Sequence, residues 1–402
     1  MIHRYADYHK HSIYHAEAIV VGTGAGGAAA GTTMAEAGVD VLFVEEGSYH
    51  PTSSFNPHMS ESIPRLYRDS GTTSILGSPN IPYMEGRCVG GTTVLNGGMT
   101  YRAPTEVLEG WERITGDAGL GPVGMESLFD SVEEAVSAKR QLPTSVGDDN
   151  RIMALGAKKL GWKSQVNRRN QESCVGTNNC VYGCPTGAKQ STLVSYMPRA
   201  IKAGARCLTE VRVERLLIEG GRCVGVVGRA VDPRTMKRTH KVIVRADSVI
   251  VACGAIHTPH LLLKHRLGRP SKQLGRNFLC HPNAKVLALY PFDINAWQGV
   301  SQWTQVREFH SEGVFFAENM IPPAPLGAAI PWHGKRSMEL LERYNQMMVT
   351  GVLVEDSTTG RVHRGPFDMP IARYDITGYD HTRFITGVQR LARLHFEMGA
   401  EM

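Results

Sequence analysis

Short apolar runs alternate with helical patterns along the first part of the chain. An apolar run at 16–21 precedes a glycine-rich turn, a small-residue helical pattern at 28–37 and a second apolar run at 39–44. A strand, a helix and a strand in this order form a parallel βαβ unit, so the pattern predicts an α/β fold. Further helices are predicted at 191–203 and 337–348. More strands are predicted at 206–219, 223–231, 241–245 and 248–253.

The glycine-rich turn has the spacing of a dinucleotide-binding site. In Gly22-Thr-Gly-Ala-Gly-Gly27, the first glycine permits a tight turn, the second lets the backbone approach a pyrophosphate, and the last allows close helix packing. The free N–H groups and the dipole of the following helix would favour the negative charge of the phosphates. Glu45, followed by Glu46, ends the second predicted strand where an acid accepts ribose hydroxyls. The predicted contacts in the turn are Gly22, Thr23, Gly24, Ala25, Gly26 and Gly27.

Composition and charge narrow the class of protein. The chain has 402 residues and a net charge of +6, and it shows no basic stripe with interleaved aromatic residues, so we expect no nucleic-acid partner. No apolar run approaches the ~18 residues of a membrane-spanning helix, so we expect no membrane span. Residues 1–15 lack the apolar core of a secretory signal, which favours a cytoplasmic location. A periplasmic location stays open if the N-terminus has been clipped.

A second glycine-rich segment lies at 86–99. Glycines at positions 90 and 91 would let the backbone approach a flat ring, and nearby polar side chains could contact the edge of such a ring. An arginine at position 87 could pair with a phosphate, although a surface salt bridge is an alternative. The candidate cofactor residues in this segment are Arg87, Gly90, Gly91, Thr92, Asn96, Gly97 and Gly98.

The segments at 86–96, 254–263 and 274–282, in this order after the first turn, resemble the glucose–methanol–choline (GMC) oxidoreductases, which are flavoproteins that oxidise alcohols. The resemblance runs from about residue 16 to residue 282. It implies FAD rather than NAD as cofactor, with hydride passing from an alcohol to flavin N5. An electron acceptor, which can be a protein, would reoxidise the flavin. The resemblance adds the cofactor contacts Val213, Cys253 and Gly254. Departures at 99–101 and 265–268 resemble the long-chain-alcohol and sterol-like branch.

The resemblance also implies a discontinuous architecture. The β-rich insert before the strand at 248–253 indicates that the chain returns to the first sheet, which would complete a Rossmann-like FAD-binding domain. A second, substrate-binding domain would be built on a β-sheet and helices. The expected segments are 16–105 and 191–285 for the FAD domain, 106–190 for a substrate or cap region, and 286–402 for an incomplete substrate-binding domain.

Three cysteines lie close together in the expected cap region, at Cys174, Cys180 and Cys184. Their spacing, with a proline after the last, can hold iron–sulfur chemistry, and it resembles the site of GMC sugar dehydrogenases that carry a [3Fe–4S] cluster. The longer pattern through Lys189 also resembles alcohol-oxidising relatives without a cluster. A [3Fe–4S] site and a purely structural loop therefore both stay open.

The C-terminal part contains no recognisable catalytic motif of the family. GMC enzymes use a C-terminal histidine as a base, and none of the histidines after residue 282 lies in that context, so the catalytic residue is unknown. We therefore expect a C-terminally truncated GMC sequence. Two functions from different classes stay open: an FAD-dependent enzyme acting on CH–OH groups of a small-molecule alcohol, and a non-catalytic or incomplete flavin-binding fragment completed by another chain. An NAD(P)-linked dehydrogenase would explain only the first glycine turn.

Overall fold

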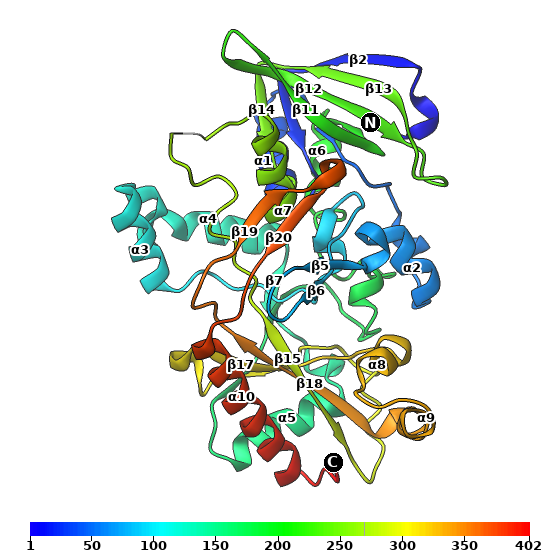
Figure 1. Cartoon of the computed structure of the whole chain (residues 1–402), viewed down its shortest axis with the longest axis vertical. Coiled ribbons are helices and arrows are strands. Elements are labelled where there is room, and N and C mark those ends of the chain that lie inside the picture. Colours follow the sequence, from blue (N-terminus) through cyan, green and yellow to red (C-terminus); the bar gives the residue numbers. More distant parts are fainter. Residues whose placement is uncertain (269) are drawn as a thin grey trace. The chain divides into compact units, whose positions relative to one another are not determined.

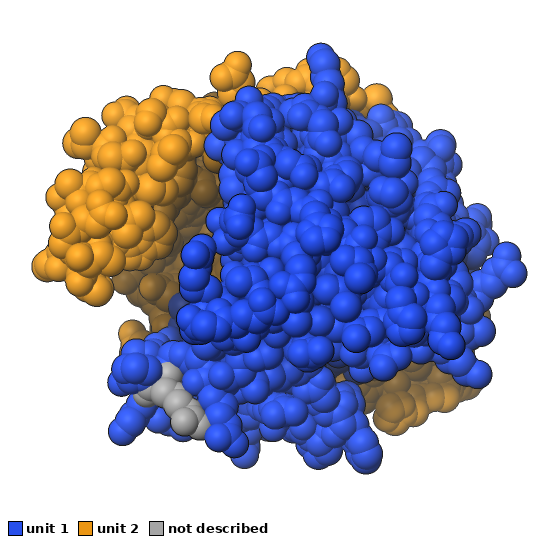
Figure 2. Space-filling model, turned by 90° about the horizontal axis from the view of Figure 1, so that it is seen from above, with its two compact units in different colours: residues 1–98, 179–279, 359–375 blue, residues 99–178, 280–358, 376–402 orange. Residues whose placement is uncertain are grey.

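The chain folds into two compact units, which Figure 2 shows in different colours. The computed structural model describes residues 1–268 and 270–402, so Arg269, in the expected second FAD segment, lies outside the described residues. Unit 1 comprises residues 1–98, 179–279 and 359–375. Unit 2 comprises residues 99–178, 280–358 and 376–402. Both units contain helices and sheets, and the predicted α/β class with a Rossmann-like domain is confirmed.

A five-stranded parallel sheet forms the centre of unit 1, in the order β1-β10-β4-β3-β14. Its edge strand β14 and the helix α1 are labelled in Figure 1. The first βαβ unit lies where the hydrophobic pattern predicts it. Helix α1 connects the two central strands, β3 and β4. The strand bounds are Ile2–His3 for β1, Ala18–Val21 for β3, Val41–Val44 for β4, Arg206–Leu208 for β10 and Ser248–Val251 for β14, and α1 spans Ala25–Glu36.

Different layers cover the two faces of this sheet. Helix α1 packs on one face so closely that a Cβ on Gly31 would overlap the ring of Phe43, and α6 (Tyr196–Lys202) lies against α1. The other face buries Ile19 and Leu42 in a core shared with a second sheet, of order β11-β12-β13-β2. The strands of this second sheet are His11–His15, Val211–Glu219, Arg222–Val231 and Arg238–Arg245.

The remaining elements of unit 1 lie in segments that carry weaker sequence signals. The loop-rich stretch at 47–86 contains helix α2 (Met59–Leu66) and the hairpin β5–β6 (Thr73–Ile75 and Ile81–Tyr83). Helix α7 (Gly254–Lys264) follows β14. A second hairpin, β19–β20 (Arg361–Arg364 and Pro370–Arg373), packs against α7.

Unit 2 is built on a five-stranded antiparallel sheet, in the order β15-β18-β17-β16-β8. Helices α5 and α10 bury Met153, Leu391 and Leu394 against sheet residues such as Phe316 and Val352. Helices α8 and α9 contribute to a second apolar cluster with the same sheet. The strands are Ser164–Val166, Asn283–Leu289, Thr304–Val306, Val314–Glu318 and Met347–Val354. The helices are Asp148–Lys159 (α5), Pro323–Ala329 (α8), Lys335–Glu342 (α9) and Gly378–Glu397 (α10).

Other parts of unit 2 are a helical pair and a small hairpin. Helices α3 (Thr105–Thr115) and α4 (Pro122–Ala135) follow one another, and β7 (Ala138–Arg140) pairs with β9 (Arg168–Asn170). One predicted helix is partly wrong. The helical pattern at 337–348 ends at Glu342, because Met347–Val354 pairs with strands on both sides as β18.

Candidate cofactor site

The glycine turn after β3 has one packed side and one open side. Gly22 has a φ of +99°, and a Cβ there would lie 2.5 Å from the carbonyl oxygen of Ala252, so another residue would be strained. A Cβ on Gly27 would overlap the carbonyl oxygen of Gly22. By contrast, a Cβ on Gly24 or Gly26 would meet no atom within 4 Å. Packing within the protein therefore requires glycine at positions 22 and 27, whereas Gly24 and Gly26 border space that no protein atom fills.

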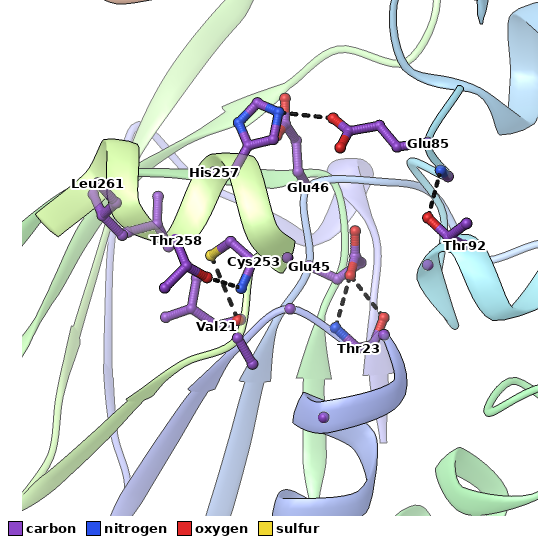
Figure 3. Close-up of a pocket in the computed structure, with 18 of the residues that line it drawn as sticks. Val21, Thr23, Glu45, Glu46, Glu85, Thr92, Cys253, His257, Thr258 and Leu261 are labelled. Atoms are coloured by element: carbon purple, nitrogen blue, oxygen red, sulfur yellow. Dashed lines mark hydrogen bonds and ion pairs between the residues drawn. The ribbon is translucent and has the colours of Figure 1, made fainter. Parts of the chain in front are cut away.

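That open side faces a cavity of about 710 Å³ whose lining lies entirely within unit 1. The cavity lies at the carboxyl ends of β3, β4 and β14, where ligands bind in open α/β sheets (Figure 3). Many of the predicted cofactor residues line it. They are Gly22, Thr23, Gly24, Ala25, Gly26, Glu45, Glu46, Gly91, Thr92, Asn96, Val213, Cys253 and Gly254.

The other predicted cofactor residues are not in the lining. Gly27 packs against the turn, and the N–H of Gly90 donates to the Thr23 hydroxyl at 2.9 Å. The Nη2 of Arg87 donates to the sulfur of Met236 at 3.3 Å. Gly97 and Gly98 follow the lining residue Asn96. Gly27 and Gly90 therefore support the shape of the cavity without lining it.

Glu45 ties the two glycine segments together through Thr23. Its Oε2 accepts hydrogen bonds from the backbone N–H of Thr23 at 3.0 Å and from the Thr23 hydroxyl at 2.7 Å (Figure 3). Its Oε1 accepts from the backbone N–H of Gly47 at 2.9 Å. Burial raises the pKa of Glu45, and these hydrogen bonds oppose that rise. The carboxylate therefore holds the turn and still borders the cavity.

Glu46 belongs to a chain of charged groups on the cavity wall. Burial alone would raise the pKa of Glu46, but the charges of Arg68 and Arg212 outweigh it and lower the pKa to about 2. Arg68 also pairs with Glu85, whose carboxylate lies 2.7 Å from His257 Nε2. Burial would raise the pKa of Glu85 as well, but His257 and Arg68 lower it. Figure 3 shows the His257 ring facing Glu85.

Two further side chains in the cavity wall are neutral at ordinary pH: Cys253, directly before α7, and His260, within α7. Burial raises the pKa of the Cys253 thiol to about 12, and its sulfur lies 3.6 Å from the carbonyl oxygen of Val21. Burial and the charge of Lys264 lower the pKa of His260 to about 4. A thiol protonated in this way is a poor nucleophile, so Cys253 contributes shape rather than reactivity.

Sequence reasoning missed several residues that line the cavity. Arg68 lies in the segment that reads as loop, and Glu85 directly precedes the second glycine segment. Helix α7 contributes His257, His260 and Lys264. Both histidines fall inside the family-like motif at 254–263, which could have indicated them as cavity residues. The contacts among these charged groups join segments far apart in the chain, which residue patterns do not reveal.

The three clustered cysteines do not form a metal site in the structure. Among residues 1–268 and 270–402, no group of three or more His, Cys, Asp or Glu side chains could hold a metal ion. Cys174 belongs to unit 2, whereas Cys180 and Cys184 belong to unit 1. The Cys184 sulfur lies 3.3 Å from the Thr186 hydroxyl and 3.5 Å from the Lys189 amide. The iron–sulfur alternative therefore gains no support, and these contacts suit the structural loop.

Of the histidines near the C-terminus, His395 lies buried in unit 2. Its Nδ1 lies 2.9 Å from the Tyr290 hydroxyl, and its Nε2 lies 2.9 Å from the Thr350 hydroxyl. Burial lowers the pKa of His395 to about 4. Both ring nitrogens have partners inside the core of unit 2, so His395 acts there as a structural residue.

The fold and the cavity define a class of protein, an α/β protein with a dinucleotide-type site. Comparison with known families then identifies the family. Residues 63–283, more than half of the chain, match the family model described as GMC oxidoreductase. The chain belongs to the GMC oxidoreductase family, which confirms the predicted resemblance.

Known relatives and solved structures agree with this assignment. An uncharacterized GMC-type oxidoreductase of Mycobacterium tuberculosis is 36% identical over 394 residues, which cover 97% of this chain and 61% of the relative. A long-chain-alcohol oxidase of Arabidopsis thaliana is 27% identical, over 86% of this chain and 48% of the relative. The crystal structure of pyridoxine 4-oxidase from Mesorbium loti shares the fold, with a TM-score of 0.70, 15% identity, and coverage of 96% and 82%.

The chain spans at most about three fifths of the length of these curated relatives, between 48% and 61% for the two named above. In the part of the chain that the structure describes, no helix is both long and apolar enough to cross a membrane.

Proposed function

We propose that this chain binds FAD in the cavity of unit 1 and takes part in oxidising the CH–OH group of an alcohol. The observation that carries the proposal is the open glycine turn. Gly24 and Gly26 line the cavity at the N-terminus of α1, and a side chain on either would project into space that no protein atom fills. Backbone N–H groups at a helix N-terminus with free space beside them suit a pyrophosphate.

The rest of the lining fits the remaining parts of FAD. We assign the ribose to the neighbourhood of Glu45 and the flavin ring to the second glycine segment, where Gly91 has little bulk and Thr92 and Asn96 are polar. The adenine would lie beside Val213 and Cys253. The proposed contacts are Gly22, Thr23, Gly24, Ala25, Gly26, Glu45, Glu46, Gly91, Thr92, Asn96, Val213, Cys253 and Gly254, with Gly27, Arg87, Gly90, Gly97 and Gly98 around them.

The second glycine segment favours FAD over NAD. A nicotinamide dinucleotide would account for the turn at 22–27 but leave the wall formed by Gly91, Thr92 and Asn96 without a role. Bound FAD would accept a hydride from the carbon that carries the hydroxyl group. This chain's residues would hold and orient the cofactor, and unit 1 would be the flavin-binding domain.

We propose long-chain primary alcohols as the substrate class. Three relatives named long-chain-alcohol oxidases each match 96% of this chain, so the similarity includes unit 2 as well as the cofactor cavity. Unit 2, with its antiparallel sheet and helices, would be the substrate-binding domain. The histidine base of the reaction is not assigned to any residue of this chain.

A substitution that disturbs ligand binding and leaves the fold intact tests the FAD site. Gly26→Val places a side chain in the cavity where no protein atom lies within 4 Å, so the fold should tolerate it. Gly110, in α3 of unit 2, also has no neighbour within 4 Å, and Gly110→Val is the matched control. We expect G26V to weaken FAD binding in a fluorescence titration at least about tenfold, which corresponds to ~1.4 kcal/mol, and G110V to leave it unchanged. Equal FAD affinity of G26V and wild type would contradict the site.

Reduction by alcohol separates an enzyme from a flavin-binding fragment. The purified, FAD-loaded chain is mixed without oxygen with a long-chain primary alcohol, and the visible flavin absorbance is followed. Bleaching supports an enzyme that acts on alcohols. Stable absorbance with bound FAD supports a flavin-binding chain that needs a second chain for catalysis.

A further inference from the structure

Lys189 is a buried lysine at the end of the cysteine segment, and it lies entirely within unit 1. It is only 5% exposed, whereas lysines are almost never fully buried unless they are paired. Its Nζ donates to three backbone carbonyl oxygens: Val94 at 2.7 Å, Asn96 at 2.8 Å and Cys180 at 2.6 Å. An ammonium group has three N–H donors, so these acceptors match its full donor capacity.

Two of these carbonyls belong to the loop that borders the cofactor cavity. Residues 91–94 form a 3₁₀ turn, which Leu95 and Asn96 follow. Gly91, Thr92 and Asn96 all line the cavity. The third carbonyl belongs to the cysteine segment. The ammonium thus fixes the position of the loop's C-terminal end against residue 180. Carbonyl groups carry partial negative charge, so the buried ammonium stabilises this arrangement as well as being stabilised by it.

The neighbouring Thr192 makes a second set of contacts with the same loops. Its hydroxyl lies 3.0 Å from the carbonyl oxygen of Thr23 and 3.1 Å from that of Gly90. Its backbone N–H donates to the Thr93 hydroxyl at 3.0 Å. The segment from Lys189 to Thr192 is therefore bonded to both glycine turns that form the cavity, which residue spacing alone does not indicate.

We infer that Lys189 is a positioning residue for the flavin: its ammonium holds the loop at 91–96 in the shape that presents Thr92 and Asn96 to the cofactor. The inference rests on the proposed FAD site. It also gives the cysteine segment a role without metal, because the backbone carbonyl of Cys180 supplies one side of the ammonium cage.

The first test is the variant Lys189→Met, which keeps the length of the side chain and removes its donors and charge. Lys202, exposed at the end of α6, gives the control K202M. We expect K189M to bind FAD at least about tenfold more weakly than wild type, and K202M to bind it equally well. In the wild type the amides of Leu95 and Asn96 both donate to the Thr92 carbonyl at 3.0 Å, and their hydrogen exchange should be faster in K189M. Unchanged FAD affinity and unchanged exchange in K189M would overturn the inference.

A second variant keeps the inference testable if K189M unfolds. Lys189→Ala leaves a cavity beside three carbonyls, and added ethylammonium should partly restore FAD binding, because it supplies the missing ammonium donors. Ethanol at the same concentration, with a hydroxyl in place of the ammonium group, should not restore it. Failure of ethylammonium to restore FAD binding in a folded K189A would count against the inference. If wild type itself binds no FAD, the proposed function fails first, and this outcome is distinct from a selective loss in the lysine variants.

Discussion

Replacing Thr23 with valine tests how strongly the two glycine turns depend on one another. Valine has nearly the volume of threonine, so the change removes a hydroxyl and leaves packing almost unaltered. Thr23 is fully buried. Its hydroxyl donates to Glu45 at 2.7 Å and accepts from the N–H of Gly90 at 2.9 Å. The substitution would leave the Gly90 N–H without this acceptor and deprive Glu45 of one donor.

The structure allows the size of the effect to be worked out. A hydrogen bond to a charged group contributes about 1.5–3 kcal/mol and a neutral one about 1 kcal/mol, so T23V should destabilise unit 1 by roughly 2–4 kcal/mol. Thr33→Val is the matched control on α1. The Thr33 hydroxyl is exposed and bonds only locally, to the Ala29 carbonyl at 3.0 Å. The control should change stability by less than about 0.5 kcal/mol.

Hydrogen exchange is the appropriate assay, because a chain with two units need not unfold in a single step. The slowest amides of β3 and β4 report opening of the central sheet of unit 1. We expect T23V to speed their exchange by about 30-fold or more at a pH where opening is an equilibrium, and T33V to leave it nearly unchanged. Similar exchange in T23V and T33V would refute the idea that Thr23 couples the two turns.

Two further predictions concern buried carboxyl groups. The folded pKa of Glu46 is about 2, below its ordinary value of 4.5, so the stability that the ionised carboxylate contributes is present above pH 4.5 and is lost as the pH falls towards 2. In urea unfolding, E46Q should reduce this loss of stability at acid pH by up to about 3 kcal/mol. The same loss in E46Q and wild type would show that the charges of Arg68 and Arg212 do not stabilise the fold through Glu46. In unit 2 the carboxyl groups of Asp149 and Glu318 are hydrogen-bonded to each other, and burial raises the pKa of both. Their stabilisation is therefore lost as the pH rises through the folded values, so E318Q should be more stable than wild type at about pH 8 and less pH-dependent. Equal pH slopes for E318Q and wild type would contradict a proton shared by the two carboxyl groups.

Local patterns in the sequence were enough to predict the first βαβ unit and the position of its turn. The apolar runs beside Gly22 and before Glu45 become β3 and β4, because both strands are buried on two faces and read as continuous apolar segments. The glycine spacing then fixes where a ligand could approach the backbone. These features depend on residues close together in the chain, which is why they can be predicted.

Elements that depend on distant pairing could not be predicted in the same way. The polar segment His11–His15 becomes strand β2 only by pairing with β13, and Met347–Val354 becomes β18 by lying between two other strands. The ion pairs of Arg68 join the 3₁₀ turn after α2 to Glu46 and Glu85. The hydrogen bond from Lys189 to the Val94 carbonyl joins residues 95 positions apart. A pattern within one segment contains no information about such partners.

The cofactor released from the purified chain tests the proposed FAD site in unit 1 most directly. The protein is denatured, and the released small molecules are separated and quantified against protein concentration, with added FAD supplied beforehand to fill empty sites. We expect FAD at a one-to-one ratio with the chain, retained through gel filtration. A chain that is folded and retains no FAD, or that retains NAD or FMN instead, would contradict it.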